Sequence, residues 1–259
     1  MIKQKRGIGH KAQISVFIIL AIVIVLIIIV LVSRTDLKTI FIGKTPVQQI
    51  EDCVSDNIES GLSILKLQGG SIEPSNYYLY KGNKVEYVCY TEEILRRCVM
   101  QKPLLKNSIS DELKKYSEPK INTCLQNIKS RLEKKGYDVN MKKPEVSIDI
   151  IPDNVLTEVD LDLSISKDGT ESYKRINIGT KSKLYNFVMI ASSIMSWETR
   201  FGDSETMNYM LHYPSIKVEK KKQGDETKIY IITDRDTQEK FMFAIKSMPL
   251  PIGIVGEIR

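Results

Sequence analysis

Residues Ile14–Val32 read ISVFIILAIVIVLIIIVLV, and this stretch decides how the rest of the chain is interpreted. Its nineteen residues include no charge, no glycine and no proline, and Ser15 is the one polar residue among them. A helix of that length extends roughly 29 Å, close to the ~30 Å hydrocarbon core of a bilayer. Because the stretch is apolar on every face, it is typical of a membrane-spanning helix. We therefore predict a transmembrane helix over residues 14–32.

The charges that flank this stretch predict its orientation. Residues 1–13 contain four basic residues and no acid, so this tail carries four of the six net positive charges of the 259-residue chain. Short basic flanks stay on the cytoplasmic side of a membrane. We expect a single-pass protein of the cell membrane, with a cytoplasmic N-terminus and residues 33–259 outside. A cleaved secretory signal is the alternative, but the stretch is long and no small-residue cleavage site follows it.

The part of the chain after the predicted span, 33–259, is long enough for one large or two small folded domains. A composition of 42% hydrophobic and 27% charged residues is that of a folded protein. Disordered chains are poorer in apolar residues. Outside the tail the net charge is only +2. A domain so close to neutral lacks the basic surface that nucleic-acid binding requires. The expected partners are the lipid bilayer, other cell-surface proteins or a surface polymer.

Four cysteines, an even number, lie in the predicted outer part. They are Cys53, Cys89, Cys98 and Cys124, and no two of them have the CxxC spacing of a zinc site. In an oxidising compartment we expect two disulfides. Of three possible connectivities we prefer Cys89–Cys98 nested inside Cys53–Cys124, because the short loop joins neighbouring elements. Four buried free thiols are the alternative.

The periodicity of apolar residues changes from helical to alternating near residue 142. We predict an α+β fold, with the N-terminal transmembrane helix, a helical first half with a small hairpin, and then an antiparallel sheet with one or more packed helices. The predicted parts are a basic tail or leader over 1–13, the span 14–32, a juxtamembrane linker over 33–44, a mainly helical part over 45–141 and an antiparallel part over 142–259.

Turn and cap residues place the individual elements. Thr45 and Pro46 open a helix that Gly69 and Gly70 end. Asp168 and Gly169 mark a hairpin turn. The other expected elements are a hairpin over 77–90, a helical region from Thr91 broken at Pro103, helices ending near Tyr116 and running from Glu118 to Lys135, strands around 146–150, 159–165 and 173–178, a helix over 181–201, and a meander of strands at 216–222, 228–233 and 240–246.

The segment Lys11-Ala12-Gln13-Ile14-Ser15, followed directly by the apolar run, resembles the class III leader of archaeal type IV pilins and archaellins. The resemblance is confined to about the first thirty residues and implies cleavage between Ala12 and Gln13. Assembling pilins usually carry Glu five residues after the cut, whereas this chain has Phe17. The layout also resembles a group of archaeal single-pass membrane proteins with this leader, an early "Cys … LQGG" helix and an α+β outer domain, a group that implies no activity.

Few residues of this chain are suited to catalysis. His212 lies in a plain context with no nucleophile elbow, so we interpret it as a surface or core histidine. Asp160 and Asp162 share one face of a predicted strand and could bind Ca²⁺, but they continue the polar alternation of a half-buried strand. We predict no enzymatic activity, no cofactor and no metal.

Glu198 is the one carboxylate for which we consider a catalytic role as an alternative interpretation. Glu198, Thr199 and Phe201 at a helix end faintly resemble the catalytic-Glu region of lytic transglycosylases, whose Gly-Leu-Met-Gln motif is missing here. Motifs this short match by chance. The preferred interpretation has Glu198 and Arg200 in surface contacts, with Trp197 and Phe201 as packing residues.

Two surface clusters remain. A basic run could meet acidic lipids or surface polymer, but we favour a charged edge strand that resists pairing. Tyrosines in the first hairpin suit either a binding surface or ordinary strand formation. These clusters are Lys217, Lys220, Lys221 and Lys222, and Tyr77, Tyr78, Tyr80, Tyr87 and Tyr90.

The function predicted from these features is that of a membrane-anchored cell-surface protein whose outer domain has a structural or binding role. One alternative is a type IV pilin-like subunit cleaved between Ala12 and Gln13. Another is an outer-surface hydrolase of cell-wall polymer that uses Glu198.

Overall fold

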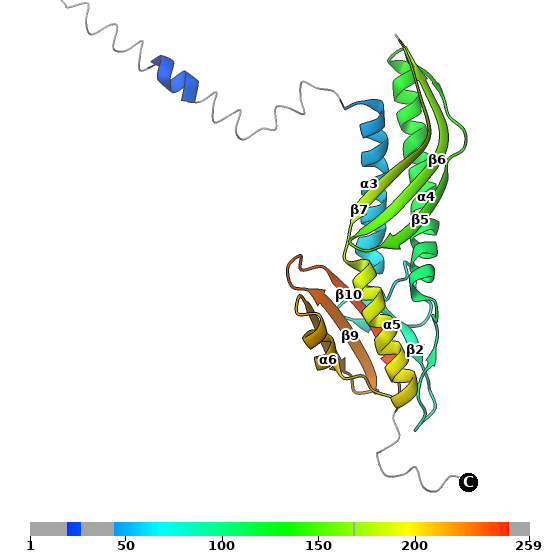
Figure 1. Cartoon of the computed structure of the whole chain (residues 1–259), viewed down its shortest axis with the longest axis vertical. Helices are drawn as coiled ribbons and strands as arrows, with labels where there is room; N and C mark the ends of the chain where they lie inside the picture. Colours follow the sequence, from blue (N-terminus) through cyan, green and yellow to red (C-terminus); the bar gives the residue numbers. More distant parts are fainter. Residues whose placement is uncertain (1–19, 27–43, 168, 249–259) are drawn as a thin grey trace, which may run out of the picture. The chain divides into compact units, whose positions relative to one another are not determined.

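The computed structural model describes residues 20–26, 44–167 and 169–248, and its fold is α+β (Figure 1). Residues 20–26 are helical; the rest of the predicted span and the leader with Ala12 and Gln13 lie outside the described residues. Within the described ranges, no helix is both long and apolar enough to cross a membrane. The chain divides into two units, Met1–Val47 and Gln48–Arg259. The elements described next belong to the second unit, apart from the first two residues of α3.

Helices α3 (Pro46–Leu65) and α4 (Leu105–Lys134) are joined by the disulfide Cys53–Cys124, whose Cα atoms are 6.3 Å apart. The predicted helix start at Pro46 is confirmed. The two helices pack closely at Gly61, where an added Cβ would lie 2.5 Å from Leu113 Cδ1. The buried residues of α3 recur at helical spacing. They are Ile50, Cys53, Val54, Ile58, Gly61, Leu62 and Leu65.

Helix α4 runs through Pro119 without a break, so the prediction of two separate helices is wrong. Proline inside a helix removes one backbone hydrogen bond and costs roughly 3 kcal/mol. An unbroken buried stripe on both sides of Pro119 offsets that cost. Its members lie three or four residues apart and are Leu105, Ile109, Leu113, Ser117, Ile121, Leu125, Ile128 and Leu132.

The helical region predicted from Thr91 is also wrong. This segment contains the short strand β3 (Val99–Met100), which pairs with the end of β2 (Asn83–Tyr90). The disulfide Cys89–Cys98, with Cα atoms 5.4 Å apart, connects β2 to the residue just before β3. Both predicted disulfide pairings are therefore confirmed. The short covalent loop holds the chain in a reversal that a continuous helix would not make.

A four-stranded antiparallel sheet is built around β6 (Asn154–Ser166). Strand β7 (Thr170–Lys181) pairs along one edge of β6, and β5 (Glu145–Ile151) and β4 (Asp138–Asn140) pair along the other. Buried and half-buried residues alternate strictly along β6, as its sequence predicted. Helix α4 packs on β4 and β5, so the apolar face of this sheet meets the helices (Figure 1).

The second sheet has the order β1-β2-β10-β9-β8, with β3 beside β2. The predicted antiparallel meander is confirmed in β8 (Ile216–Lys222), β9 (Thr227–Asp234) and β10 (Lys240–Lys246). The hairpin of β1 (Tyr77–Tyr80) and β2 joins this meander through parallel pairing of β2 with β10. The sheet is therefore mixed, and it unites strands from the first and second halves of the chain.

Helix α5 (Leu184–Phe201) contacts α4 and strands of both sheets. In Figure 1 it begins near the end of the four-stranded sheet and runs along the mixed sheet. Its apolar face is the one predicted, with Leu184, Phe187, Val188, Ala191, Ile194 and Met195 all buried. These side chains belong to one continuous core with residues of α3, α4 and both sheets. A short helix that the sequence did not predict, α6 (Thr206–His212), follows α5 and packs beside β8.

The Gln68–Ser71 turn connects α3 to the mixed sheet at Glu86. Gly69 and Gly70 both have left-handed backbone conformations, with φ of 72° and 91°. A Cβ on Gly69 would lie 2.9 Å from the Cβ of Glu86, so glycine is needed for space as well as for conformation. The buried Glu86 accepts a hydrogen bond from Ser71 at 2.6 Å and pairs with Lys102 at 2.7 Å.

Loop length predicts how much each disulfide stabilises the fold. The sequence separation is 71 for Cys53 and Cys124 and 9 for Cys89 and Cys98. The chain-entropy relation gives about 4.5 kcal/mol for the long loop and about 2.5 kcal/mol for the short one. Replacing Cys53 and Cys124 together by Ala should therefore lower the free energy of unfolding by about 2 kcal/mol more than the same change at the short loop.

Guanidinium unfolding of the full chain, followed by circular dichroism, measures this difference. Equal losses for the two double variants would contradict it. Alkylation of the native protein before any reduction is the control, since four reactive thiols would show that neither bond had formed.

Candidate functional site

A buried ion pair fastens the end of α5 to β9. The side chain of Glu198 is 0% exposed and that of Lys228 is 4% exposed. Lys228 Nζ lies 2.8 and 3.0 Å from the two carboxylate oxygens of Glu198. Tyr230, two residues along β9, donates its hydroxyl hydrogen bond to the same carboxylate. A buried charge is tolerated only when it is paired and hydrogen-bonded, and here both oxygens of Glu198 are engaged.

The same lysine and a second one hold the turn between α5 and α6. Helix α5 ends at Gly202, which has φ of 73° and donates its N–H to Glu198 O at 2.8 Å. A left-handed glycine at this position is a common helix end. Lys228 Nζ donates to Gly202 O and lies 3.1 Å from Asp203. Lys220 of β8 donates to Asp203 at 2.8 and 2.9 Å and to Ser204 O at 3.0 Å. We call Glu198, Asp203, Lys220 and Lys228 the lysine clamp.

Burial and charge act differently on the two acids of the lysine clamp. Burial raises the pKa of Glu198 above its ordinary value, and the ammonium of Lys228 offsets this only in part. Burial would also raise the pKa of Asp203, but hydrogen bonds and charge from Lys220 and Lys228 outweigh it and lower that pKa. The burial of Tyr230, together with the charge and hydrogen bond of Glu198, raises the pKa of the tyrosine, so the phenol stays a donor.

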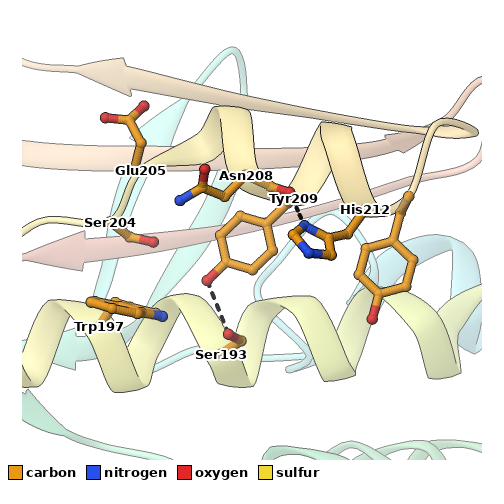
Figure 2. Close-up of a pocket in the computed structure, with 8 residues that line it drawn as sticks. Ser193, Trp197, Ser204, Glu205, Asn208, Tyr209 and His212 are labelled. Carbon is orange, nitrogen blue, oxygen red and sulfur yellow. Dashed lines mark hydrogen bonds between the residues drawn. The ribbon is translucent and has the colours of Figure 1, made fainter.

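Beside the lysine clamp lies a pocket of about 280 Å³ between α5 and α6. Figure 2 shows Ser193 and Trp197 on α5 facing Asn208 and Tyr209 on α6, with Ser204 at the turn between the helices. The Tyr209 hydroxyl lies 3.0 Å from Ser193 Oγ, a hydrogen bond that fixes the ring across the pocket. The rest of the lining is Glu205, His212 and Tyr213.

The interpretation of Glu198 as a surface residue is wrong, whereas Arg200 is exposed as expected. Glu198 is buried, whereas Trp197 is 51% exposed and Phe201 is 59% exposed. The two rings contact each other with centroids 4.9 Å apart. Helical spacing carried the correct signal, because Glu198 lies four residues after Ile194 and three after Met195 on the buried stripe. Because acidic side chains are usually exposed, Glu198 was assigned to the surface despite this spacing.

The remaining candidate residues fall in separate places. His212 is exposed at the pocket, with Nδ1 2.8 Å from Asn208 O. Asp160 and Asp162 lie on the solvated face of β6, as predicted, where Arg175 and Lys142 pair with them. No group of His, Cys, Asp or Glu in the described part of the chain could hold a metal ion.

The lysine cluster and the tyrosine cluster predicted from the sequence both lie on the mixed sheet, and their positions there decide between the alternative interpretations. Strand β8 is an edge strand, as favoured from the sequence, although Lys220 turns inward to the lysine clamp. Four of the five tyrosines pack in a small apolar cluster with Ile229 and Met242, on the sheet face that α5 does not cover, and Tyr77 is partly exposed. The tyrosines are therefore mainly packing residues. The four in the cluster are Tyr78, Tyr80, Tyr87 and Tyr90.

Comparison of this chain with protein-family models, curated proteins and solved structures finds no match.

The lysine clamp should stabilise the fold only when both the buried carboxylate and its lysine are present. Lys228→Met leaves Glu198 buried without its cation, so the free energy of unfolding should fall by about 3–5 kcal/mol. Adding Glu198→Gln removes the unpaired charge and keeps an acceptor for Tyr230. The double variant should therefore be more stable than Lys228→Met alone, as measured by chemical unfolding of the full chain.

Lys217→Met is the matched control, since Lys217 lies on β8 in an exposed pair with Glu219. Its loss should be about 0–1 kcal/mol. If Lys228→Met cost no more than Lys217→Met, the lysine clamp would not be what holds α5 to the sheet.

Proposed function

We propose that this protein is a membrane-anchored cell-surface protein whose outer domain binds a component of the cell envelope through α5 and α6. The observation that carries the proposal is the placement of Trp197, which is half exposed at the mouth of a pocket lined by hydroxyl, amide and ring groups. Exposed aromatic side chains next to placed polar groups are typical of binding surfaces.

The apolar character of this surface extends beyond the pocket. Large apolar side chains of α6 and the residues around it point to solvent, and α6 has no buried residue. Clusters of this kind mark interaction sites on soluble domains. The exposed members are Trp197, Phe201, Met207, Leu211 and Tyr213, of which Leu211 is 71% exposed.

Three features support an extracellular, anchored position. The apolar stretch 14–32 and the basic tail before it favour an N-in anchor. The two disulfides are consistent with an oxidising compartment. The predicted linker over 33–44 spans at most about 43 Å, so a domain attached by it would stay near the membrane. The proposed partner is therefore part of the envelope.

Hydrolysis of a polymer by Glu198 is not part of this proposal. A general acid must come within hydrogen-bond reach of the bond that it protonates. Glu198 is 0% exposed, and its carboxylate oxygens are occupied by Lys228 and Tyr230. The chemistry that this geometry supports for Glu198 is the anchoring of α5.

Binding to envelope material tests the proposed function. The full chain in detergent should retain envelope material prepared from the native cells, and Leu211→Ser or Trp197→Ala should weaken that retention at least tenfold. Leu79→Ser is the matched control, because Leu79 is also exposed but lies on β1, at the opposite edge of the mixed sheet from β8. No retention, or equal retention by all four proteins, would contradict the proposal.

A pilin-like subunit is the second candidate, favoured by the segment Lys11–Ser15. It predicts a mature N-terminus at Gln13, because cleavage after Ala12 removes the basic tail. Mass spectrometry of the protein from native membranes measures the N-terminal peptide. A peptide that still contains residues 1–12 would exclude the pilin-like subunit and leave the anchored surface protein.

A further inference from the structure

The pocket between α5 and α6 combines one flat apolar face with several hydrogen-bonding groups. Trp197 contributes the face, and its ring is held against Phe201. The hydroxyl and amide groups around it belong to Ser193, Ser204, Asn208 and Tyr209. The pocket volume is about 280 Å³. This volume is just below the usual range for small-molecule sites, about 300–1,000 Å³, and suits a single ring-sized group.

Ser204 is an independent sign that the pocket takes a polar ligand. The residue is 2% exposed, and its Oγ has no hydrogen-bond partner among the described residues. Figure 2 shows this hydroxyl directed toward the space between Trp197 and Tyr209. A buried hydroxyl is normally hydrogen-bonded, so a polar ligand atom that reached Ser204 Oγ from the pocket would satisfy it. The lysine clamp holds the Ser204 backbone in place through Lys220.

The charge of the lining restricts the ligand further. Glu205 is the one acidic residue among the eight lining residues, and no Lys or Arg lines the pocket. A carboxylate, sulfate or phosphate group would find no lysine or arginine here to pair with. Figure 2 shows the Glu205 carboxylate pointing away from the centre of the pocket. A neutral ligand rich in hydroxyl groups fits this lining.

We infer that the pocket binds a neutral sugar residue of an envelope glycan. The apolar face of the sugar ring packs on Trp197, and ring hydroxyls exchange hydrogen bonds with Ser204 and Asn208. Aromatic faces and hydroxyl or amide groups together match a ring that is apolar on its face and polar at its edge. This inference rests on the proposed function, since it names the ligand class for the same surface.

A purely apolar partner fits the same lining less well. Such a partner would cover Trp197 but would leave Ser204 and Asn208 without hydrogen bonds, and unpaired polar groups weaken binding. The exposed residues Met207 and Leu211 lie outside the pocket lining. They can contact whatever carries the sugar without entering the pocket.

Tryptophan fluorescence tests the inference directly, because Trp197 is the single tryptophan of the chain. The probe is the neutral glycan fraction released from the native envelope, titrated into the full chain in detergent. Binding should shift the emission of Trp197 and protect it from acrylamide quenching. The acidic glycan fraction should bind more weakly.

Variants connect this signal to the pocket. Ser204→Ala should weaken the binding of the neutral fraction about three- to tenfold, the size expected for one hydrogen bond. Ser172→Ala, at an exposed serine of β7 on the other sheet, should leave it unchanged. Thermal unfolding of both variants checks that each is folded. Equal affinity of Ser204→Ala and Ser172→Ala would overturn the role of Ser204 and with it the inference.

Chemical treatment of the envelope separates this inference from the proposed function. Periodate, which cleaves neighbouring hydroxyl pairs of sugars, should abolish retention of the envelope material, whereas protease treatment should not. Suppose that retention survives periodate, is lost with protease and still depends on Trp197. That result would contradict the inference of a sugar ligand but would still support the proposed binding surface. Absence of any Trp197-dependent retention, even with untreated envelope, would overturn both.

Discussion

Lys228 brings a positive charge into the interior where α5 ends against the mixed sheet. Removing an ammonium from water is costly, so this charge demands close partners. Glu198, Gly202 and Asp203 supply them, and all three lie at or just after the end of one helix. Lys228 of β9 therefore holds the end of α5 at Gly202 and, together with Lys220, the turn toward α6. The pocket exists because that turn is held.

The regular elements were largely predictable because their apolar residues follow simple periods. Helix α3, helix α5 and the meander of β8, β9 and β10 were all expected close to their observed bounds. In these elements local preference and burial agree, so the pattern alone is informative. The two disulfides could be predicted because few pairings were possible.

Other features depend on partners distant in sequence, which a local pattern does not contain. A break between Tyr116 and Glu118 was expected, but the buried stripe of α4 continues through it and through Pro119. Residues after Thr91 looked helical until the pairing of β3 with β2 and the bond of Cys98 to Cys89 were known. The parallel contact of β2 with β10 joins segments from opposite halves of the chain. The environment of Glu198 depends on Lys228 in the same way.

The edge strand β8 has a consequence for how copies of the protein meet. Lys217, Lys221 and Lys222 outnumber the one acid among them, Glu219, so this edge of the mixed sheet carries a net positive charge. Two such edges approaching each other would repel, and burying the ammonium groups would be costly. The β8 edge therefore resists pairing with the same edge of another copy.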